Sequence, residues 1–191
     1  MRILQGAALI ICAAGLSAGC ANPLNQATSN RYAKPCHDAE SGGRLDVAEE
    51  ACYRALVNVN WGHLGNEQKS QTMYNLARIK RKVGKFEEAE TLLKGSLEIE
   101  AKQPQPSNEK IGRRLAELSM VYGQMGRYQT GLPYVEKLYA FADLYQGNEK
   151  KIVSTIFYEY SRKIEGSESS KISAILSSKA SEMGFDANEP N

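Results

Sequence analysis

The sequence predicts an all-α fold in which helical hairpins of similar length stack on one another. The first observation is a stripe of apolar and small residues at helical spacing, made of Phe86, Ala89, Leu93, Ser96 and Leu97. The second is a near-constant interval of 41, 42 and 40 residues between Gly43, Gly84, Gly126 and Gly166. Because one hairpin cannot bury its apolar face alone, this interval predicts neighbouring hairpins that bury it.

The hairpin around Gly84 shows the local pattern most clearly. Leu76 belongs to the apolar face of its first helix, where Ala77 is small enough to let a neighbouring helix approach. Gly84 is expected to end this helix, because only glycine enters the left-handed conformation of a helix end without steric cost. Glu87 and Glu88 then occupy the first turn of the second helix, where the helix dipole favours anions.

The same residues resemble the tetratricopeptide repeat (TPR) family. The matching positions are Leu76-Ala77, Gly84-x-Phe86, Glu88-Ala89, Leu93 and Ser96-Leu97. Two positions depart from the family pattern, since Lys80 stands where Tyr is usual and Ala101 stands where Pro is usual. The resemblance implies a right-handed αα-superhelix, a TPR solenoid, with three helical hairpins and a C-terminal capping hairpin.

Segments before and after this hairpin follow the same template. The third hairpin is predicted from Leu118-Ser119, Tyr122, Gly126-x-Tyr128, Gly131, Val135 and Leu138. The second half of the first hairpin is predicted from Gly43-x-Leu45, Ala48, Glu50-Ala51, Cys52 and Ala55-Leu56. The interval exceeds the roughly 34 residues usual for these repeats, and in this it resembles the TPRs of kinesin light chains.

The last hairpin departs most from the template. Gly166 separates two apolar-striped stretches, and counting back from it places Glu159 where a small residue should permit close packing. The register of this hairpin therefore stays open, and we expect the hairpin to act as a cap with a polar outer face. The tyrosines of the later part belong either to the core or to an interface, and they are Tyr128, Tyr134, Tyr139, Tyr145, Tyr158 and Tyr160.

Residues 1–19 read as a secretory leader rather than as part of the fold. Residues 3–16 are almost wholly apolar, which is short for a membrane span of ~20 residues and typical of a signal peptide. Ser17-Ala18-Gly19-Cys20 then resembles the bacterial lipobox, which implies cleavage before Cys20 and acylation of this cysteine. The alternative is an ordinary secretory signal followed by a chance cysteine. By resemblance to enterobacterial sorting, Ala21 implies an outer-membrane lipoprotein that faces the periplasm of a Gram-negative bacterium.

Composition bounds the remaining organisation. We expect residues 20–30 to form the lipidated cysteine and a flexible tether, residues 31–185 a single TPR domain, and residues 186–191 a tail. The chain holds 24 Lys and Arg against 22 Asp and Glu. A nucleic-acid binder would show a strong basic excess, so we expect no nucleic-acid partner.

Cys36 and Cys52 are the cysteines outside the leader and the lipid site. In the repeat register they lie across from each other on the two helices of the first hairpin, so they form either a disulfide or two buried free thiols. Pro35 is expected to shorten the first of these helices. A catalytic Cys36 beside His37 is disfavoured, because sequence neighbours on a helix point in different directions and no third orienting group is evident.

No motif for catalysis, cofactor binding or metal binding stands out. The sequence has no HExxH, no CxxC and no Gly-rich phosphate loop, and its two histidines, His37 and His63, are isolated. No serine stands in a nucleophile-elbow context. We therefore expect a protein that is not an enzyme and that needs neither cofactor nor metal.

In TPR proteins the first helices of successive hairpins line a concave groove that binds peptides. By this resemblance the groove residues are Tyr74, Asn75, Arg78, Arg81, Lys82, Arg113, Glu117, Met120 and Gln124. The densest run of cations overlaps this set and consists of Arg78, Lys80, Arg81, Lys82 and Lys85. This run is either a basic wall that attracts an acidic partner segment or a solvated helix end.

Together these features predict a lipid-anchored periplasmic scaffold that binds a protein or peptide in its groove. Lipoproteins of this build resemble components of outer-membrane assembly, pilus or secretion machines, so we expect a place in such a machine. The alternative is an accessory or regulatory subunit of a cell-envelope enzyme that acts on peptidoglycan. The two differ in the partner that should be recovered with the protein.

Overall fold

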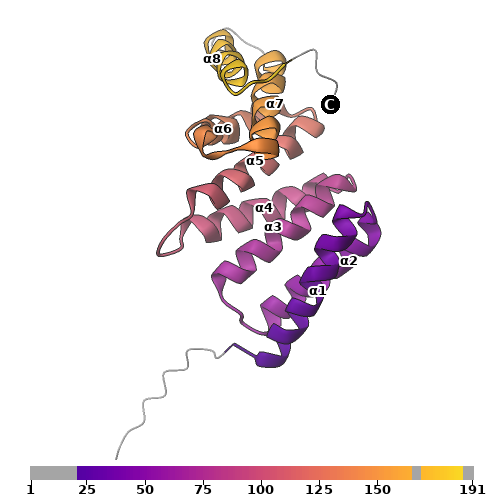
Figure 1. Cartoon of the computed structure of the whole chain (residues 1–191). Coiled ribbons are helices and arrows are strands. Elements are labelled where there is room, and N and C mark those ends of the chain that lie inside the picture. Colours follow the sequence, from indigo (N-terminus) through magenta and orange to yellow (C-terminus); the bar gives the residue numbers. More distant parts are fainter. Residues whose placement is uncertain (1–20, 165–168, 187–191) are drawn as a thin grey trace, which may run out of the picture.

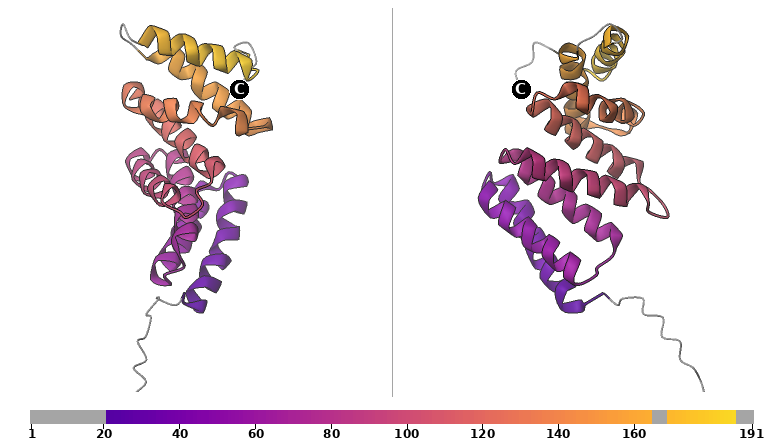
Figure 2. Two further views of the ribbon diagram at one scale, coloured as in Figure 1. Left: turned by 90° about the vertical axis from the view of Figure 1, so that its left-hand side faces the viewer. Right: turned by 180° about the vertical axis from the view of Figure 1, so that it is seen from behind.

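The computed structural model describes residues 21–164 and 169–186. Over these residues the chain forms eight α-helices and one 3₁₀ turn, with no β-strand. The elements are α1 (Pro23–Ser41), α2 (Leu45–Trp61), α3 (Asn66–Lys82), α4 (Phe86–Ala101), α5 (Asn108–Gln124), α6 (Tyr128–Tyr139), η1 (Ala142–Leu144), α7 (Gly147–Lys163) and α8 (Ser169–Glu182). Successive helices pair as four hairpins, which stack in sequence order from α1 to α8 (Figures 1 and 2). The predicted all-α fold is confirmed.

Two helix ends show why glycine recurs at this interval. Gly84 has φ +79° and Gly126 has φ +70°, a conformation that residues with a Cβ atom rarely adopt. The Lys85 N–H then bonds to the Lys80 carbonyl at 2.8 Å, and the Arg127 N–H bonds to the Tyr122 carbonyl at 2.8 Å. These bonds satisfy carbonyls that the helix end leaves free, so the chain can turn into the next helix.

A stricter repeat lies inside the hairpins. The first helix of each hairpin carries two small buried residues seven positions apart, and these pairs are Ser29/Cys36, Ser70/Ala77, Gly112/Ser119 and Ser154/Ser161. Successive pairs are 41, 42 and 42 residues apart. Residues seven apart share one face of a helix, so each pair lets the second helix of its hairpin pack closely.

This repeat fixes the register of the last hairpin. Ser154 and Ser161 are buried, and the Ser173 hydroxyl donates to the Ser161 carbonyl where α8 packs on α7. Glu159, which the sequence placed at this contact, is exposed. The expected position was two residues early because it was counted from Gly166, which lies in the connection between helices and outside the described residues. Connections vary in length more readily than packed helices do.

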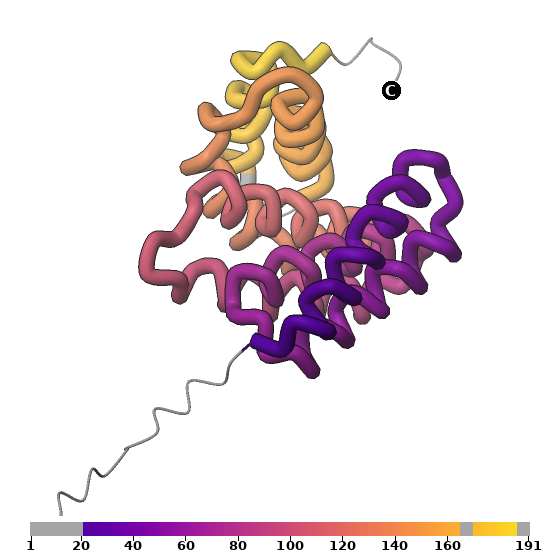
Figure 3. Tube along the Cα trace, turned by 60° about the horizontal axis from the view of Figure 1, so that its bottom comes forward, coloured from indigo at the N-terminus to yellow at the C-terminus, as the bar shows by residue number. Residues whose placement is uncertain are grey.

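The core runs through the whole stack as three buried clusters, each shared between neighbouring hairpins. Ile79 of α3 joins the cluster of the first hairpin, Leu118 of α5 joins that of the second, and Phe157 of α7 joins that of the third. Figure 3 shows the first hairpin lying along the second. Each hairpin therefore buries its apolar face against the next one, as the repeat requires.

The later tyrosines divide between core and surface. Tyr145 and Tyr160 are buried, and each directs its hydroxyl at a glycine of the third hairpin. A Cβ atom on Gly112 would lie 1.9 Å from Tyr145 Oη, and one on Gly131 would lie 2.0 Å from Tyr160 Oη. These glycines therefore serve close packing. The other tyrosines are less buried: Tyr128, Tyr134 and Tyr158 are half-buried, and Tyr139 is exposed.

Helix α1 begins earlier and continues further than the sequence suggested. The expectation of a flexible tether over residues 20–30 is wrong for residues 23–30, because α1 begins at Pro23. Asn22 caps this end by accepting the Leu24 N–H at 3.0 Å, and Pro23 has no N–H that would need a partner. Pro35 does not shorten the helix. Pro35 has no N–H to donate to the Arg31 carbonyl, which is its usual acceptor four residues earlier. Both residues are exposed, so water can bind this carbonyl instead.

Cys36 and Cys52 form a disulfide that joins α1 to α2. Their Cα atoms lie 5.0 Å apart, and both side chains are buried. The bonded Cys36 has no thiol with which to act as a nucleophile. In the chain-entropy model, a disulfide that closes a loop of about 15 residues stabilises the fold by ~3 kcal/mol.

The predicted leader (residues 1–19), the predicted lipid site Cys20 and residues 187–191 of the predicted tail lie outside the described residues. Just before that tail, Phe185 stacks on Tyr158 with ring centroids 4.3 Å apart. Within residues 21–164 and 169–186, no helix has the length and apolar character needed to cross a bilayer.

Candidate functional site

Helix α5 lies between α3 and α7, and its exposed side forms a furrow with α7. Two clefts make up this α5–α7 furrow, and they share Met120 and Ile152. The furrow is lined by Arg113, Glu117, Met120, Gln124, Glu149, Ile152, Thr155 and Glu159, with Tyr74 of α3 at one end. The cleft beside Tyr74 is small, with a cavity volume of about 60 Å³. This is well below the ~300 Å³ at which small-molecule sites begin, so the cleft suits single side chains of a bound peptide.

The floor of the furrow is apolar. Met120 is half-buried, Ile152 is 45% exposed, and Ile156 lies beneath them. Tyr74 is buried, with the guanidinium groups of Arg78 and Arg114 5.7 and 5.1 Å from its ring centroid. Burial raises the pKa of Tyr74 to about 12, so its phenol stays neutral at physiological pH. The floor therefore offers apolar contact rather than an ionised group.

Paired charges stand on the sides of the furrow. Arg113 Nε lies 2.7 Å from Glu149 of α7, and Arg113 Nη2 lies 2.6 Å from Glu109. Glu117 accepts from Arg81 Nε at 2.7 Å. The Arg113–Glu149 and Arg81–Glu117 pairs bridge neighbouring hairpins, so they hold α3, α5 and α7 in fixed relation as well as lining the furrow.

The cation run of α3 does not form an unpaired basic wall. Arg78 Nη2 lies 2.5 Å from Glu40, and Lys82 Nζ lies 2.7 Å from the same carboxylate. The other three cations bind carboxylates as well: Lys80 contacts Glu49 and Glu88, Arg81 contacts Glu117, and Lys85 contacts Glu49. All four carboxylates lie on helices other than α3, and Glu40, Glu49 and Glu117 belong to other hairpins, so the run connects hairpins. Neither alternative drawn from the sequence, a free basic wall or a merely solvated helix end, describes it.

The structure brings some of the predicted groove residues together and separates others. One cleft holds four of them, Tyr74, Arg113, Glu117 and Met120, and the second holds Met120 with Gln124. Arg78 reaches this region through Glu117 and the Tyr74 ring, and Arg81 reaches it through Glu117 and Gln124. Asn75 instead accepts the Gln71 side-chain amide along α3, and Lys82 turns toward Glu40 of α1.

The contribution of α7 to the furrow was missed from the sequence, because the register of the last hairpin was open. The 42-residue interval between equivalent positions of the hairpins could have predicted which α7 residues line the furrow. Adding this interval to Arg113 and Glu117 gives Thr155 and Glu159, and both line the second cleft.

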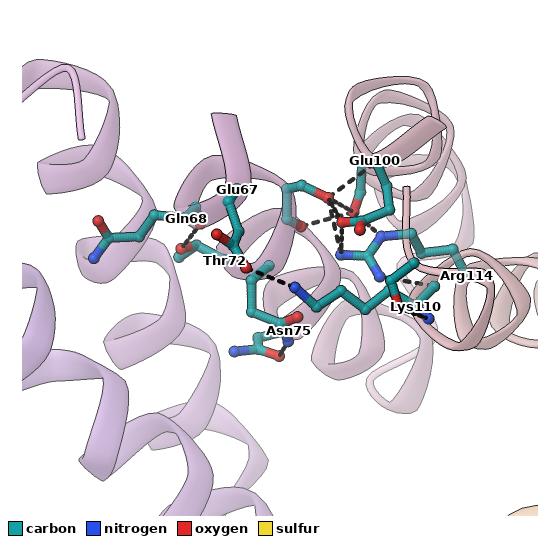
Figure 4. Close-up of polar contacts among 11 residues, drawn as sticks. Glu67, Gln68, Thr72, Asn75, Glu100, Lys110 and Arg114 are labelled. Atoms are coloured by element: carbon teal, nitrogen blue, oxygen red, sulfur yellow. Dashed lines mark hydrogen bonds and ion pairs between the residues drawn. The ribbon is translucent and has the colours of Figure 1, made fainter. Parts of the chain in front are cut away.

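A buried polar network behind the furrow was also missed. Arg114 is 1% exposed, and its guanidinium donates to Ser96 Oγ at 2.7 Å and to Ser70 Oγ at 2.9 Å. It also lies 3.5 Å from the buried carboxylate of Glu100 and donates to the Lys110 carbonyl (Figure 4). Because α3, α4 and α5 all contribute, the network locks the second hairpin to the third.

Known proteins share this architecture. Residues 68–144 match the family model of the tetratricopeptide repeat. The chain is similar in structure to BtubC (BKLC) from P. vanneervenii, with 18% identity and a TM-score of 0.69 over 87% of this chain and 69% of that chain. It is also similar to a putative kinesin light chain with nearly identical TPR-like repeats from Podosopora anserina, with 17% identity and a TM-score of 0.61 over 81% and 74%. The fold is a TPR-like solenoid.

The repeat match spans α3 to α6 and so includes one wall of the α5–α7 furrow. TPR repeats serve as scaffolds for protein–protein interaction, which agrees with a furrow suited to side chains. A search of curated protein sequences finds no match. Among the described residues, no group of three or more His, Cys, Asp or Glu side chains is placed to hold a metal ion.

Proposed function

We propose that this chain is a lipid-anchored periplasmic scaffold that holds a segment of a partner protein in the α5–α7 furrow. The observation that carries the proposal is the floor of the furrow, where Ile152 stays exposed beside Met120 between two packed helices. A strip of apolar surface between charged walls suits one face of a helical or extended segment.

The partner segment is expected to bring an apolar anchor residue rather than a run of acidic ones. Each cation of the run already pairs with Glu40, Glu49, Glu88 or Glu117, so the run offers little net attraction to an acidic peptide. The furrow itself is lined by three carboxylates and two cations, which are Glu117, Glu149 and Glu159 and Arg113 and Lys151. An apolar anchor flanked by polar or basic side chains complements this surface best.

Two features support the proposed compartment. The leader and lipobox-like sequence that end at Cys20 favour export and acylation. The Cys36–Cys52 disulfide suits an oxidising compartment such as the periplasm. We place the protein at the outer membrane on the strength of the lipobox resemblance and Ala21. We place it within an assembly, pilus or secretion machine because lipoproteins of this build resemble components of such machines.

Replacing Ile152 by Asp is expected to abolish capture of the partner while leaving the fold intact. A charge on the furrow floor removes the apolar contact and should weaken binding by about 2 kcal/mol, or roughly 30-fold. The measurement is a crosslinking pull-down from membranes of the native organism, read by mass spectrometry.

The matched control is Ile175→Asp, which makes the same change at an exposed position of α8 outside the furrow. It should retain the partner. Thermal unfolding should not change for either variant, because both side chains are exposed in the folded state. If Ile152→Asp and the wild type recover the same partner in equal amounts, the furrow is not the binding site.

A further inference from the structure

The two most exposed large apolar side chains of the described residues lie at one end of the solenoid. Leu24 is 78% exposed and Trp61 is 75% exposed. The Asn22 N–H bonds to the Gly62 carbonyl at 2.9 Å, which fixes the start of α1 beside the end of α2. Leu24 and Trp61 therefore both belong to one tip of the first hairpin, and this tip lies far from α8 (Figures 1 and 3).

The two segments that carry Leu24 and Trp61 also lack charged side chains. Residues 21–30 and 57–66, which form the start of α1 and the end of α2, contain no Asp, Glu, Lys or Arg, although such residues make up 24% of the chain. His63 is the one titratable side chain in these two segments. The nearest charges on α1 and α2 are Arg31 and Arg54, which lie roughly 10 Å or more along the helix axis from the tip, at 1.5 Å per residue. At the start of α3, Glu67 pairs with Lys110, and Lys69 lines a cleft with residues 59–66.

The connection from Cys20 to this tip is short. Because α1 begins at Pro23, only Ala21 and Asn22 separate Cys20 from the helix. Three extended peptide units reach at most ~10 Å. An acyl chain on Cys20 would therefore hold the tip at the membrane surface, with no tether long enough to hold it away.

We propose that Leu24 and Trp61 insert into the headgroup and upper acyl region of a phospholipid membrane and dock the first hairpin upright on it. This inference rests on the proposed acylation of Cys20. Tryptophan favours the membrane interface, where its ring is buried and its N–H stays hydrated, and leucine favours the acyl region below. Because residues 21–30 and 57–66 carry no charge, bringing these two segments into this region avoids the cost of burying a charged side chain. The α5–α7 furrow is then held toward the far end, away from the lipid.

Trp61 is the single tryptophan of the sequence, so its fluorescence reports on the tip without a label. The test uses chain 20–191 coupled through the Cys20 thiol to a maleimide phospholipid in vesicles of phosphatidylethanolamine and phosphatidylglycerol. With Cys36 and Cys52 joined, Cys20 is the one free thiol of this chain. Mass spectrometry of the protein purified from native membranes decides separately whether cells acylate Cys20, so the two proposals can fail independently.

Docking predicts that Trp61 emission shifts to shorter wavelength on coupling and is quenched by phospholipids brominated in the upper acyl chain. Leu24→Asp should reduce this quenching, whereas Ile175→Asp on α8 should leave it unchanged. Solvent-like emission without quenching in the coupled chain would overturn the inference. A shift that appears only at high surface density, without quenching by brominated lipid, would also overturn it and would indicate contact between copies.

Discussion

Replacing Arg114 by alanine is expected to destabilise the protein by ~3–5 kcal/mol, because it leaves the buried carboxylate of Glu100 without its cation. Glu100 and Arg114 are 2% and 1% exposed, so water cannot substitute for the lost guanidinium without opening the core. Ser70 and Ser96 would lose donors at the same time. Thermal unfolding followed by circular dichroism should show a midpoint lower by about 10 °C.

The matched control is the double variant Arg114→Met with Glu100→Gln. Methionine fills much of the arginine volume, and glutamine removes the buried charge while it can still bond to Ser70, so most of the stability should return. If Arg114→Ala is as stable as the wild type, the network does not join the second hairpin to the third.

Replacing Ala89 by Glu is expected to unfold the second hairpin, at a cost of about 4 kcal/mol or more. Ala89 is fully buried in the cluster that joins α3 and α4 to α5, so a longer side chain would separate the helices and a carboxylate would find no partner there. Helicity should fall in far-ultraviolet circular dichroism at room temperature.

Ala101→Glu serves as the control for this prediction, since it makes the same change at an exposed position of the same helix. Its stability should differ from that of the wild type by only a few tenths of a kcal/mol. Native helicity in Ala89→Glu would contradict the helix register on which the whole stack depends.

The sequence predicted the stack well because each hairpin repeats the same local rules. The helix-ending conformation of Gly84 and the burial of Ala77 and Ala89 follow from single residues and their spacing. The last hairpin was placed two residues early because it was counted from Gly166, which lies outside the described residues, between α7 and α8 in the sequence. The packed pairs, of which Ser154 and Ser161 are the last, keep the interval because helix contacts constrain them from both sides.

The candidate site was predicted less completely, because charge pairing between hairpins leaves no local trace in the sequence. The cations Arg78 and Lys82 look unpaired along α3, yet both bind Glu40 of α1. The partners of Arg114 are 44 and 14 residues away in Ser70 and Glu100. Only the stacked arrangement shows that these side chains stabilise the scaffold and that the apolar floor of the furrow remains for a partner.

Site-specific photocrosslinking in cells tests most directly whether the α5–α7 furrow binds a partner protein. A photoreactive amino acid at Thr155, which lines the furrow, is compared with one at Thr91, an exposed position on α4 outside the furrow. We expect a discrete adduct with one partner at Thr155, lost in the Ile152→Asp background, and none at Thr91. An adduct at Thr91 with none at Thr155 would contradict this account and place the partner on another face of the solenoid.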